Sequence, residues 1–504
     1  MSSWLSDREQ MLVEGAEKNN LDLPIPTQIV SNGEYLPPKQ SNLQKKVEKR
    51  MVELADENAK YLGLSRRQFL QTSCGMATAF LAMNEIYGGG VFNVNKAEAR
   101  DPELTLARTN ELSGQFIFDD QTHFLRDDFP HDAILGLGEF AAEHWNPKLK
   151  EEGLSLTRYK FENYIAELWY RSDTKMALLS GAPFDDPTWW LLGNDQIVAA
   201  RDMINDFAGT TRMLGHSVIT PKQDGWMDEA ERAMAELKPN SWKSYTIGDP
   251  LSPSKYPWRL DDEKVMYPFY EKSLKAGINT ICIHKGLLPP DYETSFKGVW
   301  KYATVDDVPK AAKDWPEMNF VIYHAALRPF LELPDQAWKE FEESGGYIKW
   351  ASDLARIPQE HGVSNVYAEL GSTFANSAVA HPRFCAAFIG TLVGGMGADH
   401  VVWGSDTVWY GSPQWQIEAM RRLEVPEDMQ KKYKLPALGG ANSLTKQAIF
   451  GLNSARIYGL SMNEATNMPD LPNFSEDKIA GLAAKFREAG GGPSNKRFGY
   501  TRKA

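Results

Sequence analysis

Short runs of β-branched and apolar residues recur along this chain at intervals that leave room for a helix between each run and the next. This alternation is typical of βα units. The runs lie at 115–119, 175–179, 212–219, 243–247, 279–283, 320–323, 365–369 and 400–404. Because eight such units favour a closed parallel barrel over an open sheet, the sequence predicts an α/β fold, a (β/α)8 barrel of the TIM type with an N-terminal extension.

The chain has 504 residues, which is enough for one large barrel domain with further segments at both ends. We expect the barrel to occupy residues 100–463. Residues 1–64 form a polar, charge-rich N-terminal extension, and residues 464–504 form a polar C-terminal tail. Both end segments are of the kind that either reach a neighbouring copy or stay disordered, so a homo-oligomer is left open.

The arginine pair Arg66-Arg67 precedes a weakly apolar stretch at 71–87, followed by the small-residue site Ala97-Glu98-Ala99. This order is typical of a twin-arginine export signal with a cleavage point near Arg100. We therefore expect residues 65–99 to be a signal segment and the protein to be periplasmic or otherwise exported, and cytoplasmic if the signal is not used. The alternative is a basic helix start followed by a buried helix. No apolar run reaches the ~20 residues that a membrane-spanning helix needs.

Composition narrows the class of ligand. A formal net charge of -12 argues against a surface that binds nucleic acid, because phosphates are neutralised by clustered Lys and Arg. A small-molecule substrate is the better expectation. The cysteines Cys74, Cys282 and Cys385 favour buried thiols over a disulfide scaffold.

Residues with metal-ligand chemistry stand where several predicted strands end. Asp119, Gln121 and His123 alternate at the first strand, and alternating side chains share one face. Similar residues follow the fifth, sixth and eighth strands: His284, His324 and Asp406. Strand ends of a βα barrel meet at one face, so these groups could bind a divalent metal. Each residue taken alone is more often a hydrogen-bonding or capping group.

The chain contains, in order, the segments Asp119-x-Gln121-x-His123, Ile283-His284-Lys285-Gly286, Ile322-Tyr323-His324-Ala325, Val402-Trp403-Gly404-Ser405-Asp406 and Gly451-Leu452-Asn453-Ser454-Ala455-Arg456-Ile457-Tyr458-Gly459-Leu460. In these segments the chain resembles the amidohydrolase superfamily. The resemblance is to the amidohydrolase-related branch that includes aminocarboxymuconate-semialdehyde decarboxylase and aromatic-acid decarboxylases. It covers most of the chain after residue 115.

The resemblance implies roles for four of these residues. His123 and His284 would bind a divalent metal, zinc or manganese, Asp406 would be a further ligand and the proton acceptor, and His324 would polarise or protonate the substrate. Gln121 departs from the family pattern, which has His there, or Glu in the decarboxylases. Because a neutral amide is a poorer zinc ligand, the metal could be absent, as in superfamily lactonases that look metal-independent.

Further residues are candidates for holding the substrate. Lys243 and Lys285 could bind a substrate carboxylate, and the alternative for both is a solvated lysine. Trp189 and Trp409 lie in aromatic-rich loops after the second and eighth strands. Exposed rings at a barrel mouth favour a flat or aromatic ligand, although they could equally pack the loops onto the rim.

The expected function is metal-dependent hydrolysis of a small cyclic or aromatic carboxylated substrate. Metal-activated water would attack, Asp406 would take the proton and His324 would act as the acid. Three alternatives stay open: non-oxidative decarboxylation at the same site, a metal-free lactonase-like reaction, and a non-catalytic exported binding protein. The substitution Asp406→Asn separates an enzyme from a binding protein, because it should abolish turnover in an enzyme and leave ligand affinity in a binding protein.

Overall fold

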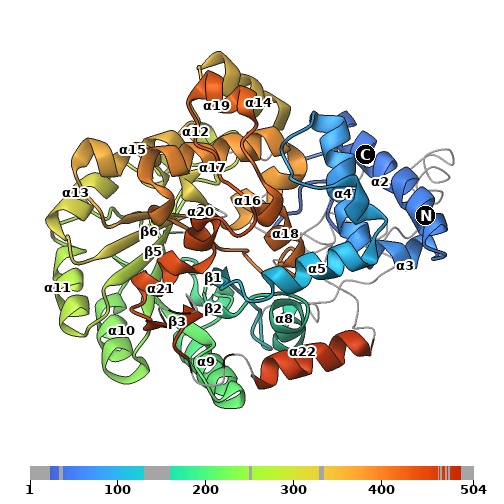
Figure 1. Cartoon of the computed structure of the whole chain (residues 1–504). Helices are drawn as coiled ribbons and strands as arrows, with labels where there is room; N and C mark the ends of the chain where they lie inside the picture. Colours follow the sequence, from blue (N-terminus) through green and yellow to red (C-terminus); the bar gives the residue numbers. More distant parts are fainter. Residues whose placement is uncertain are drawn as a thin grey trace.

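The computed structural model describes residues 23–32, 38–129, 143, 159–248, 252–328, 334–463, 465, 468–471, 474 and 477–489. Within them, eight parallel strands pair in chain order (Figure 1). The strands are β1 (Phe118–Thr122), β2 (Met176–Leu179), β3 (Met213–Val218), β4 (Ser241–Tyr245), β5 (Thr280–His284), β6 (Asn319–Tyr323), β7 (Val366–Glu369) and β8 (Val401–Val402). Each predicted strand is present, but β1 begins later than expected and carries Asp119 and Gln121 inside it.

The sheet closes on itself between β1 and the segment after β8. The backbone nitrogen of Asp120 donates to the carbonyl of Trp403 at 2.9 Å, and that of Asp406 donates to the carbonyl of Gln121 at 2.9 Å. A parallel bridge joins Thr122 to Thr407. The predicted (β/α)8 barrel is therefore confirmed.

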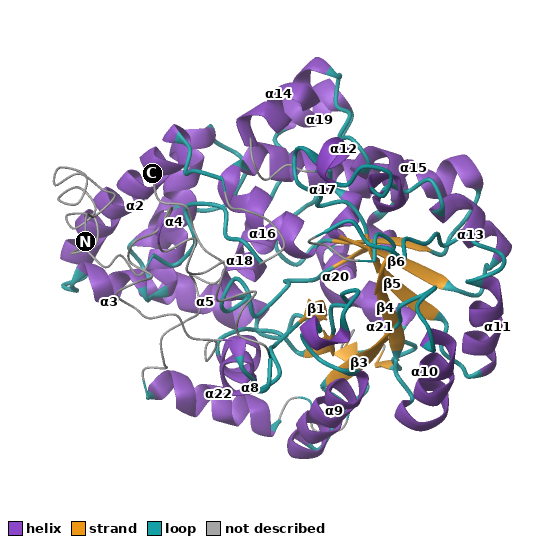
Figure 2. Cartoon of the chain, turned by 180° about the vertical axis from the view of Figure 1, so that it is seen from behind, coloured by secondary structure: helices purple, strands orange, loops and turns teal. Residues whose placement is uncertain are grey.

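Helices cover the outside of the barrel, with the strands enclosed at its centre (Figure 2). The chain returns between strands through α8 (Phe161–Ile165), α9 (Asn194–Ala208), α10 (Trp226–Arg232), α11 (Tyr267–Lys275), α12 (Tyr292–Ser295), α13 (Val308–Asp314), α14 (Pro334–Glu343), α15 (Ala351–His361), α16 (Gly371–Ala380) and α17 (Pro382–Met396). The helices after β8 are α18 (Gln414–Arg422), α19 (Glu427–Tyr433), α20 (Leu444–Gln447), α21 (Asn453–Ile457) and α22 (Lys478–Glu488). A small hairpin, β9 (Met462–Asn463) and β10 (Met468–Pro469), precedes α22.

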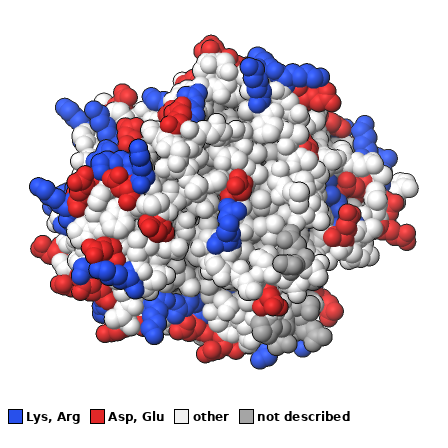
Figure 3. Space-filling view, turned by 60° about the vertical axis from the view of Figure 1, so that its left-hand side comes forward, with Lys and Arg blue, Asp and Glu red and all other residues white. Residues whose placement is uncertain are grey.

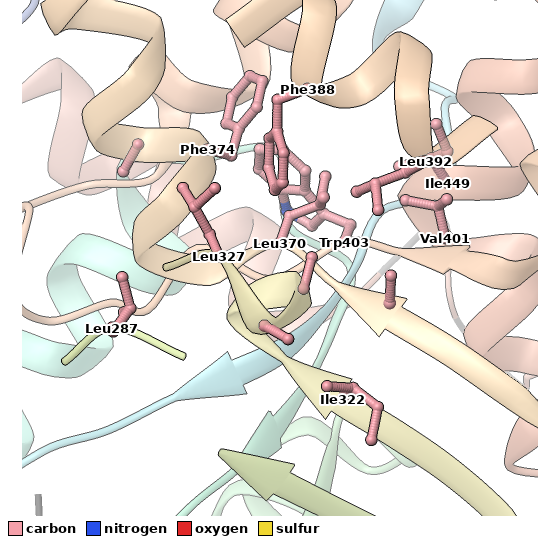
Figure 4. Close-up of a cluster of buried hydrophobic side chains, with 14 of the residues drawn as sticks. Leu287, Ile322, Leu327, Leu370, Phe374, Phe388, Leu392, Val401, Trp403 and Ile449 are labelled. Carbon is pink, nitrogen blue, oxygen red and sulfur yellow. The ribbon is translucent and has the colours of Figure 1, made fainter. Parts of the chain in front are cut away.

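Apolar side chains fill the layer between the sheet and its helices. Figure 4 shows Phe374 of α16 beside Phe388 of α17, and Leu392 of α17 beside Val401 of β8; Ile322 of β6 belongs to the same cluster, and all five are fully buried. Burying a side chain of this size stabilises the fold by about 1.5–3 kcal/mol. The outer face of the sheet is therefore a continuous hydrophobic core.

The barrel interior is apolar where the strands begin. Phe118, Met176 and Leu178 of β1 and β2 pack there with Leu214 of β3, and the ring of Tyr458 stacks on Phe118 with centroids 5.5 Å apart. Since this cluster fills the lower part of the barrel, buried polar side chains are concentrated towards the C-terminal ends of the strands. That end is where βα barrels place their functional groups.

An N-terminal group of helices lies to one side of the barrel, next to α16 and α18 (Figures 1 and 2). It contains α2 (Asn42–Tyr61), α3 (Arg66–Leu70), α4 (Ser73–Tyr87) and α5 (Pro102–Leu112). α2 begins with a capping box, in which Ser41 accepts from the backbone of Gln44 while the Gln44 side chain accepts from the backbone of Ser41. The polar extension predicted for residues 1–64 therefore includes a long helix with one buried face; residues 1–22 and 33–37 lie outside the described residues.

The segment predicted as an export signal is folded into this group. Arg66 begins α3 and pairs with Asp56, while α4 buries its apolar side chains. The hydroxyl of Tyr87 donates to the carbonyl of Ala380 at 2.8 Å, and Glu98, inside the predicted cleavage site, pairs with Arg422 at 2.7 Å. This matches the alternative of a basic helix start followed by a buried helix. Export itself stays a prediction.

The surface carries charges of both signs (Figure 3), and the cysteines lie inside the molecule. On the face shown in Figure 3, Lys and Arg lie intermixed with Asp and Glu around the rim, and uncharged residues cover much of the centre. None of the helices in the described ranges is long and apolar enough to cross a membrane. Cys74, Cys282 and Cys385 are buried free thiols, as the sequence predicts.

Candidate active site

Six buried polar side chains are supplied by β1 and by β4 to β8 or the residues that follow them. They are His123, Lys243, His284, His324, Glu369 and Asp406, and none is more than 2% exposed. Sequence reasoning singled out all of them except Glu369. Burying so many ionisable groups is costly unless their hydrogen bonds and charges compensate one another, so their arrangement indicates a functional site.

A bulge in β1 decides which of its side chains reach this cluster. The register between β1 and β2 shifts between Asp119 and Thr122, and such bulges re-aim side chains. Gln121 and His123 reach the cluster, whereas Asp119 accepts hydrogen bonds from Ser405, through its backbone nitrogen at 2.8 Å and its hydroxyl. The expectation that Asp119 shares their face is therefore wrong, because the bulge breaks the alternation.

Asp406 is held ionised by its neighbours. One carboxylate oxygen lies 3.3 Å from Nε2 of His123, and the other accepts from the hydroxyl of Ser372 and, at 3.3 Å, from the amide of Asn32. Burial by itself would raise the pKa of Asp406, but the hydrogen bond and charge of His123 outweigh burial and lower it. Nδ1 of His123 lies 2.7 Å from the carbonyl of Ser180, which fixes the ring from its other edge.

Glu369, at the end of β7, has the opposite environment. Burial, with the nearby negative charge of Asp406, raises its pKa well above the ordinary value, although the backbone nitrogen of His324 donates to it at 3.2 Å. The amide nitrogen of Gln121 also donates to Glu369, at 3.0 and 3.3 Å. Two carboxyl groups whose environments push their pKa values apart are a typical acid and base pair.

The other two histidines of the cluster are neutral. Burial lowers the pKa of His284, with the charge of Lys243 adding to the effect, and burial next to His284 lowers that of His324. Their rings meet edge to face with centroids 4.7 Å apart, and His284 stacks on Tyr245 at 4.3 Å. Nδ1 of His324 is buried and has no hydrogen-bond partner within the described part of the chain.

Lys243 supplies a buried positive charge from the middle of β4. Its ammonium group lies 3.6 Å from the centroid of the Tyr323 ring and 5.2 Å from that of Tyr245. A cation over an aromatic face in a dry site is attracted by about 2 kcal/mol. The charge of Lys243 also acts on Glu369 and on both neutral histidines, so it belongs to the cluster.

Backbone strain marks the same strand ends. Asp406 has φ 56°, and His324, Ala325 and Ala326 have φ 61°, 47° and 50°. Left-handed conformations are uncommon for residues other than glycine, and they concentrate at functional sites where the surroundings enforce them. The strain is observed at two of the residues that sequence reasoning placed in catalysis.

Of the three other residues predicted to hold the substrate, one lies at the site and two lie elsewhere. Trp409 joins the site, since its ring stacks on His123 with centroids 6.0 Å apart. Lys285 instead pairs with Asp307 at 2.9 Å and donates to the carbonyl of Tyr302, so it stabilises the loop after β5. Trp189 packs against Phe129 with centroids 6.5 Å apart, which matches the alternative of a loop packed onto the rim.

Sequence reasoning missed Glu369 and Asn32. A signal for Glu369 existed, because it ends the predicted strand at 365–369 just as His284 follows the fifth strand. The contact between Asn32 and Asp406 joins residues 374 positions apart, and no local pattern points to it. Ser372, which donates to Asp406 from the first turn of α16, follows Gly371 with φ 41°.

The residues present do not fit a resident divalent metal as they stand. Of the four expected ligands, His123 and Asp406 meet at 3.3 Å, but the group of Gln121 next to His123 is a neutral amide, which is a poor ligand for zinc. Across the described ranges, no three His, Cys, Asp or Glu side chains are grouped to hold a metal ion. The expected metal centre on His123, His284, Asp406 and Gln121 is therefore not matched by this arrangement.

Comparisons with known proteins give structural likeness alone. No family model matches the chain, and no curated protein matches its sequence. A 2,6-dihydroxybenzoate decarboxylase from Rhizobium aligns at TM-score 0.40 and 12% identity, over 68% of this chain and 99% of its own. A 5-carboxyvanillate decarboxylase from Sphingomonas paucimobilis gives 0.38 and 14%, over 69% and 100%.

A third solved structure is a dihydroxybenzoic acid decarboxylase from Polaromonas sp. JS666 with bound manganese and an inhibitor. It aligns at TM-score 0.42 and 14% identity, over 69% of this chain and 98% of its own. These low values assign neither an activity nor a metal to this chain.

Proposed function

We propose that this chain is an enzyme that removes carbon dioxide from a small cyclic or aromatic carboxylic acid, with Glu369 as the proton donor. The observation that carries the proposal is the buried Glu369 carboxyl group, whose pKa is raised by burial and by Asp406. A buried carboxyl group whose pKa is raised holds its proton to a higher pH than an ordinary carboxyl group, which suits it to act as a proton donor. Decarboxylation needs such a donor at the carbon atom that loses carbon dioxide.

The other residues of the cluster supply the remaining steps. Asp406, ionised beside His123, accepts the proton of a ring hydroxyl, which makes the ring electron-rich. The electron-rich ring carbon that carries the carboxylate takes the proton of Glu369 and forms the new C–H bond. The bond to the carboxylate then breaks, its electron pair restores the aromatic ring as carbon dioxide leaves, and Asp406 returns its proton to the ring oxygen. Lys243 offsets the negative charge on the substrate, and solvent returns a proton to Glu369.

Hydrolysis without a metal is the second candidate. The pair of Asp406 and His123 could remove a proton from water, and Glu369 could protonate the leaving group. Asp406, whose pKa is lowered, is a weak base in both reactions, but a ring hydroxyl, with a pKa of about 10 as in tyrosine, gives up its proton far more readily than water, with a pKa of about 16. The arrangement therefore favours decarboxylation, an alternative in the sequence analysis, over the metal-activated hydrolysis expected first.

The test uses purified full-length protein and a panel of hydroxylated benzoates, including 2,6-dihydroxybenzoate, together with aromatic lactones. Products are identified by mass spectrometry, with and without added manganese. Loss of carbon dioxide supports the proposal, and addition of water supports the second candidate. Both activities should vanish in Asp406→Asn. A protein that binds panel members, keeps that affinity in Asp406→Asn and converts none of them is a binding protein, which contradicts the proposal.

A further inference from the structure

A segment that precedes the N-terminal helices reaches the candidate active site. Residues 23–32 are described by the structure, and Ile25, Ile29, Val30 and Ser31 are each no more than 1% exposed. Asn32, at the end of the segment, is 7% exposed. A chain segment buried so completely without regular secondary structure must satisfy its backbone groups through specific partners.

Those partners belong to the end of the barrel that carries Asp406. The amide of Asn32 donates to a carboxylate oxygen of Asp406 and to the hydroxyl of Ser372, both at 3.3 Å. The backbone nitrogen of Val30 donates to the side chain of Asn376 at 3.1 Å. Asn376 in turn donates to the hydroxyl of Tyr410 at 3.2 Å.

The contact between Asn376 and Tyr410 closes a ring of hydrogen bonds that leads back to Asp406. The hydroxyl of Tyr410 donates to that of Ser372 at 2.6 Å, and Ser372 donates to Asp406. Asn32 and Ser372 therefore engage one carboxylate oxygen of Asp406 while His123 lies beside the other. A carboxylate engaged on both oxygens cannot rotate freely, so each of these donors helps to set its plane.

The other end of the segment is tied to the N-terminal helices. The hydroxyl of Thr27 donates to Glu48 of α2 at 2.7 Å, and the amide of Gln40 donates to Glu48 at 2.9 Å. α2 packs on α4, and Tyr87 of α4 donates to the carbonyl of Ala380 in the barrel layer. The segment is therefore held by the N-terminal helices on one side and by the barrel on the other.

We propose that residues 23–32 are part of the active site, that Asn32 is a positioning residue for Asp406, and that the protein works with its N-terminal region attached. The claim about Asn32 rests on the proposed function of Asp406. A chain released at Arg100 would lack Asn32 and the segment that delivers it, so the proposal assigns residues 1–99 a role beyond any export signal.

The first test does not need a substrate. Full-length Asn32→Asp places a second carboxylate against Asp406, and Asn32→Ala removes the donor; Asn110, exposed on α5, gives the matched controls Asn110→Asp and Asn110→Ala. Hydrogen–deuterium exchange is measured on peptides covering residues 23–32 and 401–410. Among these four variants, only Asn32→Asp is expected to exchange faster than the wild type in both peptides. Exchange equal to that of the Asn110 controls would overturn the proposed placement of the segment.

The second test separates positioning from packing. On a substrate identified from the panel, Asn32→Ala should lower kcat by about 10- to 100-fold with little change in KM and in melting temperature, because a small misplacement of a reacting group costs up to about 10²-fold. An unchanged kcat would mean that Asn32 only packs, which contradicts its positioning role. If no panel member reacts, the proposed function fails, and the exchange measurement still decides whether the segment lies at Asp406.

The third test concerns the attached N-terminal region. The intact mass of the folded, active protein, purified after expression in a host with twin-arginine export, should include residues 23–32. A folded and active species that begins at Arg100 would overturn this part of the proposal.

Discussion

Glu369 depends on a glycine on the neighbouring strand end. A Cβ atom on Gly404 would lie 1.8 Å from an Oε1 atom of Glu369 and 3.2 Å from the Cβ of Gln121. Since Glu369 is fully buried, its carboxyl group cannot move aside into solvent. Gly404 is thus required by the close approach of two strand ends, which gives a physical reason for the Gly-Ser-Asp order at 404–406.

Gly404→Ala should therefore displace Glu369 and lower activity. We expect at least a tenfold loss of kcat with destabilisation of about 1–3 kcal/mol, the usual cost of overpacking a buried site. Gly440→Ala is the matched control, because a Cβ there meets nothing within 4 Å. Steady-state kinetics and urea unfolding check both variants, and equal behaviour of the two would contradict the close packing around Glu369.

Gln121 is the residue that separates this site from a metal centre. Because Gln121 supplies a neutral amide, we expect protein purified without chelators to hold well under one equivalent of zinc or manganese per chain. Gln121→His adds an imidazole between His123 and His324 and should increase bound zinc, because imidazole is a better zinc ligand than an amide. Elemental analysis checks this. A full equivalent of metal in the wild type, lost in His123→Ala, would show that these residues do hold a resident metal and would contradict this prediction.

Single residues also show where sequence reasoning succeeded. The sequence predicts that His123, His324 and Asp406 follow strands, and the structure has each of them after a strand, at the end of the barrel where strand ends converge. Their roles stay predictions. The orientation of Asp119 was wrong because a bulge cannot be read from alternation, and the partner of Lys285 was missed because Asp307 lies in a loop. The contact made by Asn32 depends on tertiary structure over most of the chain.

Among the elements, α17 has an unusual N-terminal cap. Nδ1 of His381 accepts a hydrogen bond from the backbone nitrogen of Phe384, and the ring stacks on Trp338 with centroids 5.1 Å apart. Burial lowers the pKa of His381 from 6.5 to about 4. A protonated ring could not accept this hydrogen bond, so the cap requires the neutral form.

The His381 cap of α17 therefore makes the free energy of unfolding depend on pH, with a sign that follows from the lowered pKa of His381. Because the folded-state pKa of His381 is lowered, its contribution to stability is present above about pH 6.5 and is lost as the pH falls towards about 4. His381→Asn keeps a capping side chain but removes the titration, so its free energy of unfolding should fall less across this range. His361→Asn, at an exposed position, is the control. Parallel pH profiles for wild type and His381→Asn would contradict the assignment.

The strands and the N-terminal helices differ in how far sequence could describe them. All eight strands were placed, since the period-two pattern and the helix-length spacing are local signals. The stretch at 71–87 carries two signals at once, because an export signal and a buried helix are both apolar behind a basic start. Only the packing of α4 against the barrel shows that it is part of the fold.

The whole molecule consists of a barrel, an N-terminal group of helices and a segment, residues 23–32, that links them at the candidate active site. The fold could be predicted from residues that repeat in a regular pattern. The proposed reaction could not, because it rests on pKa values of Glu369 and Asp406 that shift in opposite directions through burial and through neighbours distant in sequence. Asp406 and Glu369 differ in this respect although both stand at strand ends.

The most direct measurement is carbon dioxide release from the hydroxybenzoate panel by wild type and Glu369→Gln, in deuterated water, with Glu103→Gln as the exposed control. We expect the wild type to release carbon dioxide and to place deuterium on the carbon atom that loses the carboxylate. Glu369→Gln should still bind the substrate but react about 10²- to 10⁴-fold more slowly, the usual contribution of a general acid. Addition of water without carbon dioxide release, or a Glu369→Gln variant as fast as wild type, would contradict it.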